Sequence, residues 1–290
     1  MRIKSFAKIN LGIEVLGKRN DGYHEIRTMF QSIDLFDLLA FFPRTQNEII
    51  LKGDDDSIPW DGSNLIHQAA TLLKERHAIK TGMEIHVTKN IPAGKGLGGG
   101  SSNAAMTLSA LNKMWKIGLE KDALRDLGAQ LGADIPYFFE GGLCLGQGKG
   151  NILFPQEDLN PFLCVLVLPS VSVSTAAVYE RFCASLTSQV KDSKIIKFLD
   201  NRDLGFLEND LEETVFRSYP QINAIKILIQ EQGSELTLMS GSGSAVYGLF
   251  HQRKKAMKAL RTLSNEHAVI LTTTLSRTEY RKRITIQTGV

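Results

Sequence analysis

Alternation of apolar and polar residues predicts β-strands near the N-terminus. The two types alternate over residues 3–16 and 26–42, and again in Met-Glu-Ile-His-Val at residues 83–87. A period of two residues is typical of a half-buried strand. The same half contains three predicted helices: residues 64–74, the segment with Ala104, Leu108, Leu111 and Trp115 at steps of four, three and four, and the segment with Leu124, Leu127 and Leu131 on one face.

The second half of the chain alternates short strands with helices. Its first strand is the apolar run at residues 162–168, which is far too short to span a bilayer. The order of elements predicts an α+β fold. The stretch from Pro155 to Pro161 marks a junction between two expected domains, residues 1–155 and 156–290. The other predicted elements are helices at 175–184, 223–230 and 252–263, strands at 235–239, 245–250 and 268–273, and a polar loop around 188–193.

Length, composition and charge are those of an ordinary globular chain. Its 290 residues can bury a sizeable core, and 43% of them are hydrophobic. The net charge of +3 suits an anionic ligand but gives no sign of the concentrated basic face of a nucleic-acid binder. Lys4 and Lys8 interrupt the apolar start, so no signal peptide is predicted. Three widely spaced cysteines form neither a metal motif nor a disulfide framework, which favours a reducing cytoplasm.

The most informative stretch runs from Pro92 to Asn103 and reads PAGKGLGGGSSN. It follows the strand at residues 83–87 and leads into a helix, which we expect Ser101 or Ser102 to cap. Glycines let the backbone approach an anion closely, and the free N–H groups of a helix N-terminus favour negative charge. This glycine loop therefore predicts a phosphate site.

Two known phosphate motifs and a ligand-free turn compete with this interpretation of the glycine loop. Gly94, Gly96 and Gly99 satisfy G-x-G-x-x-G, and Glu120 follows about twenty residues on, but the dinucleotide motif belongs to a compact βαβ unit with a buried first strand. A P-loop requires Ser or Thr after Gly-Lys, whereas Lys95 is followed by glycine. A glycine-rich turn that binds no ligand is the remaining alternative, although ordering so many glycines costs much backbone entropy.

Several motifs together resemble the GHMP kinases, a superfamily that includes homoserine, galactose and mevalonate kinases. Besides the glycine loop, the sequence has Ala-Lys-Ile-Asn-Leu at 7–11, Asp-Gly-Tyr-His at 21–24 and Met-Ser-Gly-Ser-Gly-Ser-Ala at 239–245. The first two of these, with Gly-Ala-Asp-Ile-Pro at 132–136 and Asn-Asp-Leu-Glu at 209–212, are similar to the branch that phosphorylates 4-diphosphocytidyl-2-C-methyl-D-erythritol. The resemblance implies a two-domain GHMP kinase fold, with an N-terminal domain like domain 2 of ribosomal protein S5 and a ferredoxin-like C-terminal domain.

Lys8 and Asp134 are the catalytic residues that the resemblance implies. A carboxylate can accept the proton of the attacking hydroxyl during phosphoryl transfer, and Asp134 lies in the matching segment. Judged only by its position before Ile-Pro, Asp134 would more simply be the N-cap of a helix. Lys8 is a polar insertion in a mostly apolar strand, so it needs a partner, and the resemblance names Asp134.

ATP and Mg²⁺ are the implied cofactors, although the sequence does not identify the residues that would hold the metal. Asn64 is both a candidate adenine contact and a candidate N-cap. Lys95 either contacts a phosphate or the nucleotide, or is an exposed residue with no part in binding. The predicted ATP-binding residues are Asn64, Pro92, Ala93, Gly94, Lys95, Gly96, Leu97, Gly98, Gly99, Gly100, Ser101 and Ser102.

The resemblance also implies a cytosine pocket. The base would lie between two aromatic rings while a histidine contacts its polar edge, and Tyr23 and His24 stand at matching positions. The second ring is assigned to Tyr179, with Phe182 as the alternative. Tyr179 could equally be a core residue of its amphipathic helix. The predicted substrate-binding residues are Asn10, Tyr23, His24, Tyr179, Gly241 and Ser242.

We therefore expect a cytoplasmic ATP-dependent kinase that phosphorylates the 2-hydroxyl of 4-diphosphocytidyl-2-C-methyl-D-erythritol, in the non-mevalonate route to isoprenoid precursors. Its partner would be this small cytidine diphosphate-linked substrate, without nucleic acid or membrane, and the chain would be a monomer or weak homodimer. Two alternatives are a GHMP kinase of the homoserine or mevalonate type and a nucleotide-binding sensor without turnover. Asp-Gly-Tyr-His argues against the first, and the presence of both Lys8 and Asp134 against the second.

Overall fold

Two long antiparallel strands form the centre of the first sheet. The computed structural model describes residues 1–183 and 192–284. Strand β1 (Arg2–Lys18) pairs with β2 (His24–Arg44), so that Lys8 lies opposite Ser32. The sheet has the order β3-β4-β2-β5-β6, and β1 pairs with β2. The shorter strands are β3 (Ile49–Gly53), β4 (Gly82–Thr88), β5 (Leu143–Gln147) and β6 (Ile152–Pro155).

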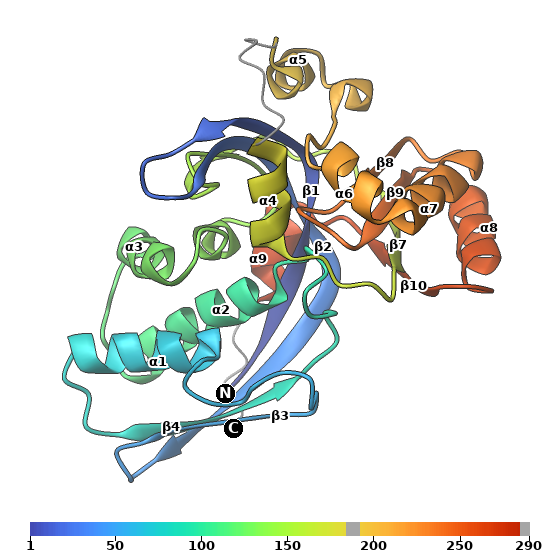
Figure 1. Cartoon of the computed structure of the whole chain (residues 1–290). Coiled ribbons are helices and arrows are strands. Elements are labelled where there is room, and N and C mark those ends of the chain that lie inside the picture. Colours follow the sequence, from blue (N-terminus) through green and yellow to red (C-terminus); the bar gives the residue numbers. More distant parts are fainter. Residues whose placement is uncertain (184–191, 285–290) are drawn as a thin grey trace.

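Helices cover one face of this sheet (Figure 1). They are α1 (Leu65–Arg76), α2 (Gly99–Met114), α3 (Lys121–Leu131) and the short 3-10 helix η1 (Ile135–Phe139). Phe41 and Ile85 of the sheet pack with Leu73 of α1 and Leu108 of α2 in one buried cluster. The apolar periodicity of the sequence supplies both faces of this core.

The second sheet has the order β10-β7-β9-β8, and all its pairs are antiparallel. Its strands are β7 (Leu163–Leu168), β8 (Leu236–Met239), β9 (Val246–Phe250) and β10 (Ala268–Thr273). The helices of this half are α4 (Thr175–Cys183), α5 (Lys194–Asn201), the 3-10 helix η2 (Leu204–Phe206), α6 (Glu212–Ser218), α7 (Pro220–Glu231), α8 (Arg253–Leu263) and α9 (Arg277–Arg283).

Strand β1 also packs against the second sheet. Ile9 and Leu11 share a buried cluster with Cys164 of β7 and Tyr247 of β9. The Tyr247 hydroxyl donates a 2.8 Å hydrogen bond to the carbonyl of Asn10. The strand that carries Lys8 is therefore held from both sides, which fixes its side chains relative to both halves of the molecule.

The strands and helices predicted in the sequence are confirmed where they fall on described residues. The helix expected at 175–184 forms α4 up to Cys183, and residues 184 and 188–191 lie outside the described residues. Strands β3, β5 and β6 and helices α5, α6 and α9 were not predicted. These elements have four to eight residues each, too few to establish a period. In the part of the chain that the structure describes, no helix is both long and apolar enough to cross a membrane.

Candidate active site

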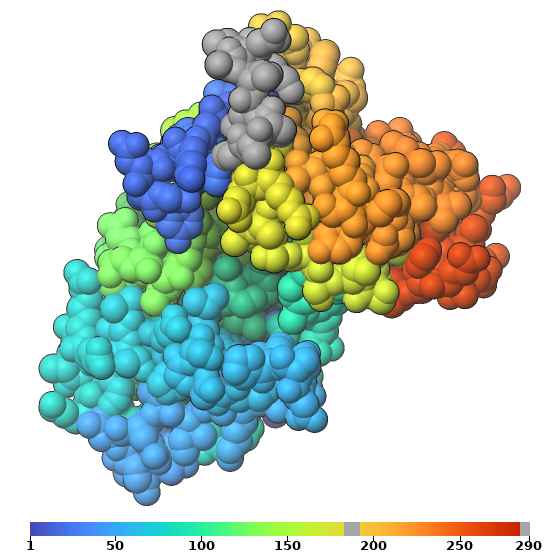
Figure 2. All heavy atoms as spheres, in the orientation of Figure 1, coloured from blue at the N-terminus to red at the C-terminus, as the bar shows by residue number. Residues whose placement is uncertain are grey.

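A cavity of about 770 Å³ lies where β1, the glycine loop, α4 and residues 239–245, here called the third glycine motif, meet. Figure 2 shows the surface hollowed between α4 and the helices of the first domain. The residues lining it include every predicted catalytic and substrate-binding residue: Lys8, Asn10, Tyr23, His24, Asp134, Tyr179, Gly241 and Ser242.

A second cavity of about 450 Å³ lies on the other side of the glycine loop. Asn64 and the loop residues from Pro92 to Ser101 line it, whereas Ser102 does not. Gly96, Gly98 and Ser101 line both cavities. A nucleotide in the second cavity and an acceptor in the first would therefore meet at these three residues.

The start of α2 differs from the prediction. The helix begins at Gly99, and its N-cap is Gly98, in the left-handed conformation with φ 69° and no capping side chain. The expected cap by Ser101 or Ser102 is wrong, because the glycines start the helix three to four residues earlier than a serine cap would allow. The first-turn N–H groups are thus left for a ligand, which is the arrangement that binds phosphate.

The two serines of the loop differ in their surroundings. Ser102 is buried, and its hydroxyl accepts a 2.6 Å hydrogen bond from Ser5 of β1. Ser101 is partly exposed and lines both cavities. Ser101 therefore can reach a phosphate with its hydroxyl, whereas Ser102 fastens α2 to β1.

The Lys95 side chain is partly buried and is directed to the second domain. Its ammonium donates to the carbonyls of Pro169 (2.7 Å) and Val171 (2.8 Å) and to the Ser244 hydroxyl (3.2 Å). Burial lowers the pKa of this lysine. Its side chain therefore links the glycine loop to the second domain.

Lys8 and Asp134 meet as predicted from the resemblance. Lys8 is 4% exposed, and its Nζ lies 3.4 Å from Oδ2 of Asp134. Asp134 precedes η1, and its side chain forms no capping hydrogen bond there. The Asp134 carboxylate therefore does not cap η1 and lines the cavity instead.

Asn10 holds Lys8 in place. Its amide oxygen accepts a 2.5 Å hydrogen bond from Lys8 Nζ, and its amide nitrogen donates to the Thr28 hydroxyl at 2.8 Å. Thr28 in turn donates to the carbonyl of Gly12. Both ends of the buried amide are therefore used, so Asn10 lines the cavity but acts mainly on Lys8.

The aromatic residues do not form the open slot that was expected. The rings of His24 and Tyr179 stack directly, with centroids 4.9 Å apart and an interplanar angle of 25°. Tyr23 is 54% exposed, and Lys149 Nζ lies 4.2 Å from its ring centroid. Burial and the charge of Lys18 lower the pKa of His24, while burial and the charge of Asp134 raise the pKa of Tyr179.

The third glycine motif closes the cavity from the second domain. Asn209 donates to the carbonyls of Met239 (2.9 Å) and Gly241 (2.8 Å). The Ser242 hydroxyl lies 2.7 Å from that of Thr175 on α4. The Asn-Asp-Leu-Glu motif thus has a structural role in this turn.

Asp37 organises the glycine loop but was not among the residues predicted from the sequence. It is fully buried, accepts hydrogen bonds from the backbone of Asn90 and Ile91 at 2.8 Å, and pairs with Lys89 and with Asn103 of α2. It fixes the chain on both sides of the glycine loop. Asp37 is the single polar residue in the apolar run at residues 35–42, which was the available signal.

Asn64 is the N-cap of α1. Its side chain accepts a 3.0 Å hydrogen bond from the backbone of Ile66, at the start of this helix, and donates to the carbonyl of Pro59. It also lines the nucleotide-side cavity, so the cap and an adenine contact remain compatible.

Comparison with known proteins agrees with this geometry. Family models described as the GHMP kinase N-terminal and C-terminal domains match residues 64–142 and 195–269. A homoserine kinase from Cytophaga hutchinsonii has the same fold, with a TM-score of 0.70 over 95% of both chains at 18% identity. The chain is a GHMP kinase with the expected two-domain fold, and it is therefore an ATP-dependent small-molecule kinase.

More similar relatives define the family within this class. The chain is 39% identical to the 4-diphosphocytidyl-2-C-methyl-D-erythritol kinase of Alkaliphilus metalliredigens, over 91% of this chain and 92% of that protein. For the enzyme of the same name from Prosthecochloris aestuarii the identity is 40%, over 90% and 93%. A crystal structure of 4-(cytidine 5'-diphospho)-2C-methyl-D-erythritol kinase gives a TM-score of 0.79 at 32% identity, covering 94% and 99%. The chain belongs to the 4-diphosphocytidyl-2-C-methyl-D-erythritol kinase family.

Proposed function

We propose that this protein transfers the γ-phosphate of ATP to the 2-hydroxyl of 4-diphosphocytidyl-2-C-methyl-D-erythritol. The observation that supports this best is the position of the Lys8–Asp134 pair. Both residues line the acceptor cavity, next to Gly96, Gly98 and Ser101, which also line the nucleotide cavity. Phosphoryl transfer depends on in-line positioning and neutralised charge, and this junction of two cavities offers both.

Each residue has a distinct part in the proposed reaction. The first-turn N–H groups of α2 and the Ser101 hydroxyl bind the phosphates of ATP. The Asp134 carboxylate accepts the proton of the attacking hydroxyl, and the Lys8 ammonium balances the charge that develops. The hydrogen bond from Lys8 to Asn10 limits the positions that the ammonium can take. Little further movement is then needed at the reacting centre.

Mg²⁺ fits this site as a partner of the nucleotide phosphates. Among the described residues no group of three or more His, Cys, Asp or Glu could hold a metal. Mg²⁺ commonly uses only one or two carboxylates and completes its coordination with phosphates and water. Ser101 offers a hydroxyl oxygen beside the glycine loop, and the ion would neutralise phosphate charge there.

Binding of the cytosine requires a change at the aromatic residues. A stacked contact of 4.9 Å between His24 and Tyr179 leaves no space for a third ring between them. We infer that the base displaces the His24 ring from Tyr179 and stacks there itself, with Tyr23 on the other face. The neutral imidazole of His24 then can accept a hydrogen bond at the polar edge of the base.

Steady-state kinetics with altered substrates test this assignment. A uridine analogue replaces the amino donor of cytosine by a carbonyl acceptor, and buried groups built for the donor would be left unpaired. We expect kcat/KM to fall at least about tenfold, equivalent to roughly 1.4 kcal/mol. Methylerythritol phosphate without the cytidine should be a poorer substrate still. Equal turnover of the cytidine and uridine substrates would refute the cytosine pocket.

The oligomeric state and the cytoplasmic location stay predictions.

A further inference from the structure

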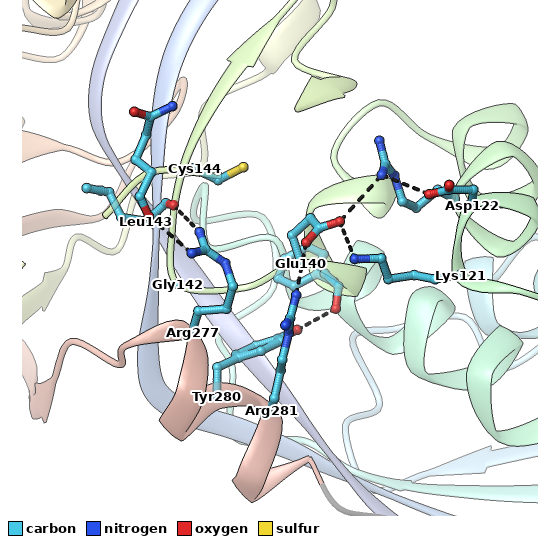
Figure 3. A network of polar contacts seen from close by, with 12 residues as sticks. Lys121, Asp122, Glu140, Gly142, Leu143, Cys144, Arg277, Tyr280 and Arg281 are labelled. Atoms are coloured by element: carbon cyan, nitrogen blue, oxygen red, sulfur yellow. Dashed lines mark hydrogen bonds and ion pairs between the residues drawn. The ribbon is translucent and has the colours of Figure 1, made fainter. Parts of the chain in front are cut away.

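The C-terminal helix α9 returns from the second sheet to the first domain. Its first residue, Arg277, donates to the carbonyls of Gln156 and Leu143 through its guanidinium. The backbone N–H of Arg277 donates a 2.8 Å hydrogen bond to Asp158. Figure 3 shows Arg277 projecting from α9 toward Leu143, whereas Tyr280 projects toward the segment that carries Glu140. The N-terminus of the helix is therefore fastened to Leu143 of the first domain and to the segment at residues 156–158 that follows it.

Tyr280 of α9 contacts both segments that carry the catalytic residues. Its side chain is 1% exposed, and its hydroxyl donates a 2.7 Å hydrogen bond to the carbonyl of Phe138 in η1. Its ring packs against Phe6 of β1, with centroids 5.7 Å apart. Phe6 precedes Lys8 by two residues, and Asp134 directly precedes η1.

Helix η1 is held at its other end by charge. The buried carboxylate of Glu140 pairs with Lys121 at 2.7 Å and Arg125 at 3.4 Å, both on α3, and with Arg281 of α9 at 3.2 Å. Figure 3 shows Lys121 of α3 and Arg281 of α9 approaching Glu140 from the two helices. Since only the five residues of η1 separate Asp134 from Glu140, this anchor and Tyr280 limit where Asp134 can lie.

Phe138 connects this arrangement to the glycine loop as well. A Cβ atom built on Gly98 would lie 2.8 Å from the Phe138 ring and 3.0 Å from the Lys8 side chain. A shift of η1 would therefore move Asp134 and also disturb the packing of Phe138 beneath Gly98 and Lys8.

We propose that Tyr280 is a positioning residue for phosphoryl transfer, acting through Phe138 and η1 on Asp134. The inference rests on the proposed function of this site and extends it to a residue outside the cavity. Small displacements of reacting groups are costly, since a misplacement of about 1 Å can lower a rate by roughly 10². The hydroxyl of Tyr280 is the part of the residue that fixes η1, whereas its ring fills the core.

Tyr280→Phe removes this hydroxyl and keeps the ring. We expect kcat to fall about tenfold or more, while KM for both substrates and the affinity for an ATP analogue change less than about twofold. In an Asp134→Asn background the same substitution should cause no further loss of kcat, because the group that it positions is already gone.

Thr274→Val is the matched control for stability. The Thr274 hydroxyl accepts a 2.9 Å hydrogen bond from the buried N–H of Phe162, so this variant also loses one buried hydrogen bond, away from η1. It should lower the melting temperature as Tyr280→Phe does but leave kcat of the folded protein unchanged. A Tyr280→Phe variant with wild-type kcat would overturn the proposal, as would equal fold-losses in the two Asp134 backgrounds. Either result leaves the proposed function intact as long as Asp134→Asn alone lowers kcat for the cytidylated substrate by about 10² or more.

Discussion

Lys8 contacts three groups before any substrate is present. Its ammonium hydrogen-bonds to Asn10, pairs with Asp134 and lies 5.5 Å from the Phe30 ring centroid. A lysine that is 4% exposed depends on such partners, because an isolated buried charge is strongly unfavourable. The contacts that offset the cost of burying the Lys8 charge also place its ammonium beside Asp134, the proposed base.

Substitution of either member of this pair should affect the chemical step. We expect Asp134→Asn to lower kcat by at least about 10², the lower end for a lost general base, while an ATP analogue still binds. Lys8→Met should lower kcat similarly and should also lower stability by roughly 1–3 kcal/mol, because the buried amide oxygen of Asn10 loses its donor. The double variant should be little worse than either single one. Wild-type kcat in Asp134→Asn would remove this residue from the mechanism.

His24 should give substrate binding a dependence on pH. Its pKa is lowered from the ordinary 6.5, first by burial and then by the charge of Lys18, so the ring is neutral at neutral pH. As the pH falls through the lowered pKa, the ring gains a proton and can no longer accept a hydrogen bond from the base. KM for the cytidylated substrate should therefore be constant near neutral pH and rise at acid pH, whereas KM for ATP should not follow it. His24→Gln should abolish this difference; an unchanged acid rise in that variant would assign the effect to another group.

At the scale of elements, the glycine loop depends on where α2 begins. Gly96 and Gly98 both have positive φ, and a Cβ atom on Gly96 would lie 2.1 Å from the carbonyl oxygen of Ser240. The loop is therefore packed between the third glycine motif and the Lys8–Phe138 contact. Its conformation follows from tertiary packing as well as from its glycines.

Gly98→Val should strongly weaken nucleotide binding. The β-branched side chain would be strained at φ 69° and would clash with Phe138 and Lys8, which moves the first-turn N–H groups of α2. Loss of even one hydrogen bond to a charged phosphate costs roughly 1.5–3 kcal/mol, so calorimetry should show at least about tenfold weaker binding of an ATP analogue. Gly118→Ala is the control: Gly118 has φ 81° with open space around it, so it shares the backbone strain but not the clash. A folded Gly98→Val variant that binds the analogue normally would contradict the phosphate site.

At the scale of the whole molecule, the sequence predicted the features that depend on local patterns but not those that depend on long-range contacts. The strands at residues 3–16 and 26–42 and the glycine loop were visible because alternation and glycine content are local. Helix α9, with seven residues, was too short to give a pattern, and its role depends on Tyr280 reaching Phe138, 142 residues away. The side chain of Lys95 was likewise unpredictable, because its partners belong to the second domain. The division into domains at residue 155 stays a prediction; β6 ends at Pro155, yet α9 packs back on the first domain.

The direct stacking of His24 on Tyr179 shows the same limit. Sequence motifs brought both residues to one site, and the structure places them in one cavity. Their spacing without a ligand could not be read from the motifs, because it depends on how α4 packs against the loop before β2. The roles of the individual site residues therefore remain proposals that the variants above address.

Turnover by the wild-type protein tests the central claim most directly. The protein would be incubated with ATP, Mg²⁺ and, in parallel, 4-diphosphocytidyl-2-C-methyl-D-erythritol, homoserine or mevalonate, with the product identified by phosphorus NMR. The account predicts that kcat/KM is by far the highest for the cytidylated substrate and that the new phosphate is on its 2-hydroxyl. Equal or faster phosphorylation of homoserine or mevalonate, or a phosphate on another hydroxyl, would contradict it.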